Sequence, residues 1–391
     1  MLYRKLVKYR AKNLTTTDKI VMDLLNSTGM LAGYTMGMNP SGRESLVVVV
    51  KGTFIIPKQG EPVTLAEQQL PLIEADTFTG EPGYSAPVYE VDYSPIKHRC
   101  DVLLNGSAYA PKGKPVSKVQ VGLKLETLTK TFVVTGNRHW EAGLSIVPSM
   151  PEVFEAMPFS YDTAFGGLDD FHEDENKHSA YMKNPIGKGF HKKMSSSLVD
   201  GTPLPNTEEI GRPVQMPNDE CQPMAFGPIG RGWESRLKYA GTYDQDWIDN
   251  TFPFLPADFD EAYFQCAPED QQIPFPKGGE EIVLVNLTPE GRTAFKLPNI
   301  EVPMVFFRKK GEKYETQAVI DTIVIEPDKG VFTMTWRASL PLKKNIFEIP
   351  QVLAGKMSRG WWRARELGKT YYPSLAHLAR ANKADVEEEE S

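Results

Sequence analysis

Three groups of side chains in this sequence have the residue types that carry out chemistry in proteins. The loop DDFHEDENKH, residues 169–178, holds two histidines and five acids, which are residue types that ligate cations. Asp258 and Asp260 in LPADFD are spaced as a potential carboxylate pair for hydrolysis. Cys266 in YFQCAPED and His139 in NRHWE would form a nucleophile and its base if the fold joined them.

Each group also has a simpler structural explanation, which we favour. Acids and histidines in a polar loop are typical of a solvated surface, and this loop includes His172, Glu173, Asp174, Glu175 and His178. Aspartates that follow proline or alanine commonly form Asx turns or helix caps, as Asp258 and Asp260 would. No cationic neighbour that would lower a thiol pKa is visible around Cys266, so we expect a buried, inert cysteine.

The common catalytic motifs are missing from the sequence. It contains no HExxH, GxSxG, GxxxxGK[ST] or GxGxxG pattern, which removes the usual signals of metalloproteases, hydrolases and nucleotide-binding enzymes. We therefore predict a protein that is not an enzyme, with no catalytic residue, no metal ligand and no cofactor.

Composition narrows the class of protein further. The 391 residues are 40% apolar, enough for a sizeable core, and the net charge of −7 argues against a general nucleic-acid binder. Three cysteines, Cys100, Cys221 and Cys266, lack CxxC spacing, which favours a reducing compartment. No apolar run approaches about 18 residues, and no apolar stretch follows the N-terminal cations. We expect a soluble, cytoplasmic protein that does not enter a membrane.

Hydrophobic patterning indicates strands on both sides of a long middle segment. Leu46–Ile56 is a continuous β-branched run, typical of a strand buried on both faces. Asp101–Gly136 alternates with period 2 between turn signals, which predicts an antiparallel meander. The second β block is predicted at Glu281–Leu287, Thr293–Leu297, Val302–Phe307, Ala318–Ile325 and Val331–Ala338, with a turn at Pro327–Gly330.

Helical signals are few. Thr16–Leu25 has a potential cap and apolar spacing, and Gln351–Arg380 has room for one or two helices. The predicted fold class is therefore mainly β: an antiparallel β-sandwich or barrel-like body with a long Gly/Pro/aromatic-rich central insertion and few helices. The predicted divisions are 1–150 (N-terminal β part), 151–280 (loop-rich central region), 281–345 (C-terminal β part joining the first), 346–380 (short helical segment) and 381–391 (disordered acidic tail).

The central insertion is the stretch most suggestive of function. Between Pro158 and Phe275 it is rich in proline and aromatic residues, without a helix or strand period. Long ordered loops usually carry function, and rigid aromatics are enriched at interface hot spots. The candidate partner-binding residues are Phe165, Asn184, Trp233, Tyr243, Asp244 and Trp247. Alternatively, any one of these aromatic side chains belongs to a second core that covers the open end of the β body.

Two other functions stay open at this point. A hydrolase acting on cell-wall or carbohydrate material would use Asp258, Asp260 or the His172 loop, converging in one deep pocket. A carbohydrate-binding β module would present Trp233, Tyr243 and Trp247 as a flat row of exposed rings.

An ordered series of short motifs resembles a known family. The motifs run through most of the chain: Val47–Phe54, Gly80–Gly83, Asp101–Gly106, Gly136–Trp140, Ala164–Gly167, Asn184–Gly187, Leu204–Asn206, Phe226–Trp233, Ala240–Trp247, Leu255–Asp260, Gly278–Glu280 and Trp336–Ala338. In this order they resemble an uncharacterised-domain family of accessory proteins of the bacterial type VI secretion system.

The resemblance implies a role in binding another protein. Members of that family act as chaperones or adaptors for secreted effectors that carry a PAAR or PAAR-like tip domain. The resemblance thus implies a cytoplasmic protein of a Gram-negative bacterium that stabilises such an effector and promotes its loading onto the VgrG spike. It implies neither catalysis nor nucleic-acid or membrane partners, and it does not identify the contact residues.

Overall fold

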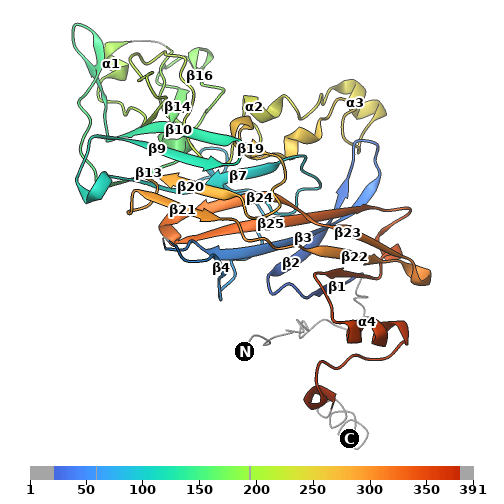
Figure 1. Cartoon of the computed structure of the whole chain (residues 1–391). Coiled ribbons are helices and arrows are strands. Elements are labelled where there is room, and N and C mark those ends of the chain that lie inside the picture. The colour runs from blue at the N-terminus through green and yellow to red at the C-terminus, as the bar shows by residue number, and fades with distance from the viewer. Residues whose placement is uncertain (1–21, 59, 193–194, 379–391) are drawn as a thin grey trace, which may run out of the picture.

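Three β-sheets form the body of the protein, as a computed structural model shows for residues 22–58, 60–192 and 195–378 (Figure 1). The largest sheet runs in the order β19-β7-β24-β25-β3-β2, with β4 beside β3. Its strands are β2 (Leu31–Met38), β3 (Glu44–Ile55), β4 (Thr64–Leu65), β7 (Cys100–Leu104), β19 (Gln272–Ile273), β24 (Val319–Glu326) and β25 (Val331–Pro341). The predicted mainly β fold is confirmed.

Strand β3 lies between β25 and β2 in this sheet, and it is buried on both faces as its β-branched run predicts. It pairs antiparallel with β25 from Ser45 to Ile55, so strands from opposite ends of the chain share one sheet. One face of β3 points into the main core. Residues 66–97 cover the other face, where the Lys51 ammonium lies 2.8 Å from the Asp92 carboxylate.

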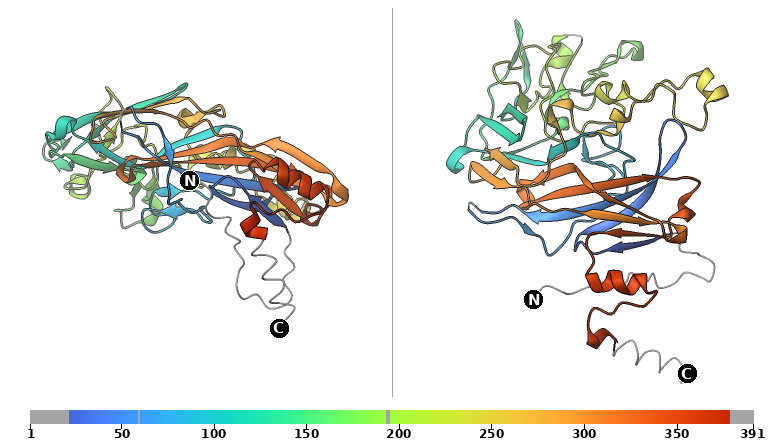
Figure 2. Two further views of the ribbon diagram at one scale, coloured as in Figure 1. Left: turned by 60° about the horizontal axis from the view of Figure 1, so that its bottom comes forward. Right: turned by 45° about the vertical axis from the view of Figure 1, so that its right-hand side comes forward.

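Two smaller sheets pack against the large one and complete a sandwich-like body (Figure 2). The five-stranded sheet has the order β18-β10-β9-β20-β21, and the four-stranded sheet β1-β26-β22-β23. Phe295 of β21 packs on Phe332 of β25 with ring centroids 5.1 Å apart, which shows the contact between layers. The strands are β1 (Asp23–Asn26), β9 (Lys118–Leu125), β10 (Leu128–Thr135), β18 (Thr207–Glu208), β20 (Glu281–Val285), β21 (Arg292–Lys296), β22 (Pro303–Phe307), β23 (Lys313–Gln317) and β26 (Gln351–Ala354).

The predicted strand positions of the C-terminal β block are confirmed, but the prediction of an N-terminal meander is wrong. β9 and β10 do form a hairpin. However, β7 pairs in parallel with β24 in the large sheet, and the intervening β8 (Gly106–Tyr109) pairs with β13 (Ala156–Phe159). Alternation with period 2 determines which face of a strand is buried, but it does not determine which strand pairs with it. Here the chain crosses from one sheet to another between β7 and β9.

The helix expectations at the two ends need correction. Asp23–Asn26 is strand β1, and the earlier part of the predicted Thr16–Leu25 helix lies outside the described residues. In the predicted helical segment, Gln351–Ala354 is strand β26, and helix α4 follows at Arg359–Glu366. Residues 381–391 of the predicted tail also lie outside the described residues.

The central region lies over one end of the sandwich and is made of loops with short elements (Figures 1 and 2). Its side chains form two small cores separate from the main one. The short elements of this region and its surroundings are β5 (Thr77–Phe78), β6 (Pro87–Tyr89), β11 (Trp140–Ala142), β12 (Ile146–Pro148), β14 (Phe165–Gly166), β15 (Leu168–Asp169), β16 (Ser179–Ala180), β17 (Lys188–Gly189), α1 (Ser196–Val199), α2 (Glu234–Leu237) and α3 (Gln245–Asn250). Within the described ranges, no helix has the length and apolar character needed to cross a membrane.

Candidate functional site

The clearest surface feature of the central region is a group of exposed apolar side chains around α3. We call residues 240–254 the aromatic lobe. Four of its side chains are strongly exposed: Tyr243 at 53%, Ile248 at 55%, Phe252 at 67% and Phe254 at 46%. The lobe projects beyond the body next to the tip of the β2–β3 hairpin (Figures 1 and 2). Exposed apolar side chains gathered in one place mark interaction surfaces more often than isolated ones do.

Short-range hydrogen bonds hold the lobe backbone in shape. The Asp244 carboxylate caps α3 by accepting from the Trp247 backbone N–H at 2.9 Å. The Asp258 carboxylate accepts from the Thr242 N–H at 2.9 Å and from its hydroxyl at 2.7 Å. The indole N–H of Trp247 donates to the Phe254 carbonyl at 2.9 Å. The exposed rings therefore stand on a backbone that is already ordered.

Trp247 is the half-buried centre of the lobe, and its neighbours stand on edge against it. The Tyr243 ring lies 4.8 Å from it at 70°, and the Phe252 ring lies 5.6 Å from it at 90°. Perpendicular rings do not make the flat row that a carbohydrate-stacking platform requires. They present an irregular apolar surface instead.

The lobe and the segment after it carry only negative charge. Residues 240–260 contain five aspartates and no lysine, arginine or histidine. The aspartates are Asp244, Asp246, Asp249, Asp258 and Asp260. An apolar centre with an acidic rim is electrostatically complementary to an apolar surface rimmed by cations.

A buried arginine attaches the N-terminal end of the lobe to the body. Arg236 of α2 is 1% exposed, and its guanidinium lies 2.6 Å from the Glu90 carboxylate. It also donates to the backbone carbonyls of Ile229 at 3.0 Å and Tyr263 at 2.8 Å. Burial alone lowers the pKa of Arg236, but the Glu90 carboxylate outweighs this and raises it. Arg236 therefore stays charged, and its contacts with Ile229 and Tyr263 hold residues on both sides of the lobe.

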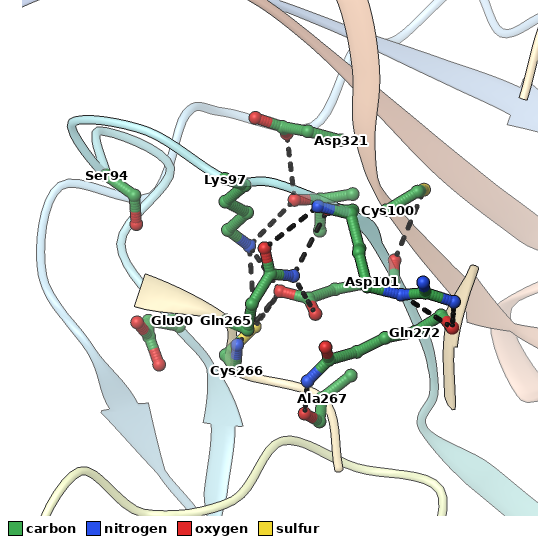
Figure 3. Close-up of polar contacts among 12 residues, drawn as sticks. Glu90, Ser94, Lys97, Cys100, Asp101, Gln265, Cys266, Ala267, Gln272 and Asp321 are labelled. Atoms are coloured by element: carbon green, nitrogen blue, oxygen red, sulfur yellow. Dashed lines mark hydrogen bonds and ion pairs between the residues drawn. The ribbon is translucent and has the colours of Figure 1, made fainter. Parts of the chain in front are cut away.

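A second buried network attaches the C-terminal end (Figure 3). The Asp101 carboxylate of β7 accepts from the Gln265 side-chain amide at 2.7 Å and from the Cys266 backbone N–H at 2.9 Å. The Lys97 ammonium lies 2.7 Å from the same carboxylate and donates to Thr322 of β24 at 2.9 Å. Asp101 is fully buried, so this network joins the segment after the lobe directly to the large sheet.

Cys266 has a cationic neighbour that its own sequence context did not reveal. The Lys97 ammonium lies 3.6 Å from its sulfur, although the two residues are far apart in the chain. Burial nevertheless raises the pKa of the Cys266 thiol well above its usual value. His139 lies elsewhere: its backbone N–H bonds the Ser149 hydroxyl, and it pairs across to Pro203. The structure does not bring Cys266 and His139 together.

Three predicted contact residues are buried, and the expectation that they form a binding surface is corrected. Phe165 is 1% exposed, Asn184 is 0% and Trp233 is 6%. The Asn184 amide donates to the backbone carbonyls of Tyr161 at 2.9 Å and Phe165 at 3.1 Å. A β-carbon added at Gly166 would lie 2.1 Å from the Asn184 carbonyl oxygen, so these loops meet backbone to backbone. Their aromatic and glycine motifs pack the loops together.

The remaining predicted chemical groups make local contacts. The Asp260 carboxylate accepts from the Ala262 N–H at 2.8 Å. In the histidine loop, the Asp174 N–H bonds Nδ1 of His172 at 3.0 Å, and Nε2 of His178 lies 2.6 Å from the His172 carbonyl oxygen. Among the residues that the structure describes, no three His, Cys, Asp or Glu side chains are placed to hold a metal ion.

A cavity of about 440 Å³ lies between the central region and the β body. Its lining includes two acids and no histidine. Glu269 is paired with Lys238 at 2.9 Å, and Asp270 is paired with Lys130 at 3.1 Å. Each carboxylate thus faces a lysine.

Comparison with known families finds a match over most of the chain. Residues 41–337 match the family described as "Uncharacterized protein conserved in bacteria (DUF2169)". The chain belongs to this family. The part shared with the DUF2169 family contains the aromatic lobe and both of its buried attachments, whereas β1, β2, β26 and α4 lie outside the match. No curated protein and no solved structure shows a significant match.

Sequence reasoning found only part of this site. It identified Tyr243, Asp244 and Trp247 but missed Phe252 and Phe254. A usable signal was present, because TFPFLP has apolar residues without a period and directly follows a segment rich in aspartate. By contrast, no local signal marks Arg236 or Asp101 as anchors, since their partners are remote in the chain.

Proposed function

We propose that this member of the DUF2169 family is a cytoplasmic adaptor and chaperone of the type VI secretion system. Its cargo is an effector that carries a PAAR or PAAR-like domain, and it promotes loading of that effector onto the VgrG spike. The observation that carries the proposal is the aromatic lobe, an exposed apolar surface on an ordered backbone. The resemblance of the chain's motifs to secretion accessory proteins supplies the kind of partner.

The lobe suits reversible capture of a protein. Apolar surface on an effector tip domain is an aggregation hazard until that domain meets the spike. The lobe covers such surface with Tyr243, Phe252 and Phe254. Release then follows when the spike offers a competing interface for the same surface, so no covalent step is needed.

The buried attachments of the lobe support the same function. A binding surface that is ordered beforehand loses less conformational entropy when its partner binds. Arg236 and Asp101 hold the two flanks of the lobe to the body through charged hydrogen bonds that are largely buried. The acidic rim adds attraction for a cargo surface with cations around its apolar centre.

Co-expression with a secreted effector that carries a PAAR or PAAR-like domain tests the proposal. The effector is expected to be soluble and to copurify with the wild-type chain, and to load onto the spike only when the chain is present. Phe252→Ala and Trp247→Ala are expected to weaken capture while circular dichroism shows a folded monomer. Leu144→Ala is the matched control, because Leu144 is fully exposed outside the lobe, in the turn between β11 and β12.

Two results would contradict the proposal. If deleting the protein changed neither the solubility nor the loading of the effector, the proposed adaptor function would be wrong. Hydrolytic activity that Asp258→Ala abolishes would favour the hydrolase instead. If Trp247→Ala unfolded the chain, Trp247 would belong to the core of the lobe. The effect of Phe252→Ala on effector capture would then decide whether the lobe contacts the effector.

A further inference from the structure

The strand β2 (Leu31–Met38) forms an open edge of the large sheet. β2 pairs with β3 on one side, and it is the last strand in the sheet order. Within the part of the chain that the structure describes, no backbone hydrogen bond is made on its outer side. Half of its backbone N–H and C=O groups therefore point outward, ready to pair with another extended chain.

This edge lacks the protection that the edges of the other sheets have. Its sequence, LAGYTMGM, contains no charged residue and no proline. The edge strand β23 carries Lys313 and Glu315, and the edge strand β21 carries Arg292 and Lys296. Charged side chains and prolines on edge strands prevent unwanted strand pairing. An uncharged edge of eight residues, about 26 Å long at 3.3 Å per residue, is suited to pairing.

The side chains of β2 leave the edge accessible. One face is closed, because a β-carbon at Gly33 would lie 2.2 Å from the Tyr93 hydroxyl and one at Gly37 3.0 Å from Pro95. On the other face Tyr34 is 38% exposed and Met36 is 39% exposed. An added strand would rest its alternate apolar side chains against these two.

The open edge is continuous with the aromatic lobe. β2 leads into the tip of the β2–β3 hairpin, where a β-carbon at Gly42 would lie 2.9 Å from the Phe254 ring. Figures 1 and 2 show the hairpin tip beside α3. One bound polypeptide can thus cover both the edge and the exposed rings, and beyond the hairpin it would meet the five aspartates of residues 240–260.

We propose that β2 is a docking edge for an extended segment of the cargo polypeptide, which joins the large sheet as an additional strand. The segment is uncharged over about eight residues and carries lysine or arginine at the end that reaches the lobe. This inference rests on the proposed function and names the chemistry of its partner. A second copy of the chain is a poorer occupant, since antiparallel pairing of two β2 strands sends the two lobes to opposite ends and leaves their rings exposed.

Hydrogen exchange measured by mass spectrometry on the complex with a PAAR-domain effector tests the inference. We expect amides of residues 31–38 to exchange more slowly in the complex than in the free protein. Met36→Lys places a charge on the edge and is expected to weaken effector binding roughly tenfold. The matched control is Tyr314→Lys on the already charged edge strand β23, which is expected to bind as the wild type does.

The outcomes separate this inference from the proposed function. If the complex forms without protection at residues 31–38 and Met36→Lys binds normally, the docking edge is overturned and the adaptor function stands. If no complex forms, the adaptor function is overturned and the docking edge with it. If the chain alone dimerises and the dimer protects β2, or if deletion of residues 1–21 exposes β2 to exchange, the occupant is not cargo and the inference is wrong.

Discussion

The inner central region and the aromatic lobe share a composition but differ in burial. In the inner region, here residues 159–233, the rings pack on one another: Tyr161 lies 5.0 Å from Trp233, and Phe165 lies 5.1 Å from Tyr181. In the lobe, Tyr243 and Phe252 also contact a central ring, yet more than half of each side chain is exposed. Aromatic content alone therefore does not tell a second core from a contact surface.

The difference in burial between the two regions explains how a long loop region stays ordered while some of its rings are exposed. The inner rings bury their surface against glycine-rich backbone, which lets loops without regular hydrogen-bond ladders keep one conformation. The lobe needs few rings of its own for folding, because buried charged groups at Arg236 and Asp101 hold its flanks. Its remaining rings are then left exposed.

The largest effect should come from breaking the buried attachment at Asp101. Asp101→Ala leaves the Lys97 ammonium buried without its carboxylate, which costs about 3–5 kcal/mol of unfolding free energy. Urea unfolding followed by tryptophan fluorescence measures this loss. Asp258→Ala removes a carboxylate that also accepts two hydrogen bonds, but on the exposed side of the lobe, and is expected to cost much less. Equal losses in the two variants would contradict the distinction between anchor and lobe.

Removing one ring from each region tests the comparison most directly. Trp233→Ala opens a cavity against Tyr161 and is expected to destabilise the protein by about 3 kcal/mol. Tyr243→Ala is expected to change stability by no more than about 0.5 kcal/mol, because its ring is largely exposed. The same urea titrations report both values. A large loss for Tyr243→Ala would place that ring in a core and remove it from the proposed contact surface.

A smaller, local effect is expected at the cap of α3. Asp244→Ala removes the acceptor for the Trp247 N–H, at a cost of about 1 kcal/mol to a helix of six residues. Hydrogen exchange should rise in residues 245–250 while the rest of the chain keeps its protection. Asp249→Ala is the matched control, since it removes the same charge without removing a cap. If both variants weaken cargo binding equally, the acidic rim contributes more than the ordered helix.

Local sequence patterns were sufficient for several of the long strands and for part of the lobe. The β-branched run of β3 and the turn at Pro327–Gly330 depend on neighbouring residues, so both were predictable. Pairing of β7 with β24 depends on residues more than two hundred positions apart, and a period of two says nothing about it. Strand β23 was missed because KYETQ is short and charged, as an edge strand often is.

The site was harder to predict than the strands for a related reason. Tyr243 and Asp244, two of the predicted contact residues, follow Gly241 and Thr242; Tyr243 is exposed, and Asp244 caps a helix. Phe165 and Trp233 have the same local appearance, but they are buried by loops distant in sequence. Exposure of an aromatic side chain is decided by what packs on it, and only the folded chain supplies that information.

The pH dependence of stability gives the smallest and most local test of the inner region. His191 is 4% exposed, and burial lowers its pKa, with Asp169 nearby opposing this only in part. In the unfolded chain the imidazole binds a proton near its usual pKa of about 6.5. Below that pH the unfolded state therefore binds more protons than the folded state, so stability falls as pH falls through this range. The urea midpoint should be lower at pH 5.5 than at pH 7.5, and the difference should shrink in His191→Gln. If the difference in urea midpoint between the two pH values were the same in His191→Gln, His191 would not be the source of the pH dependence. The imidazole of His191 would then bind a proton as easily in the folded chain as in the unfolded one.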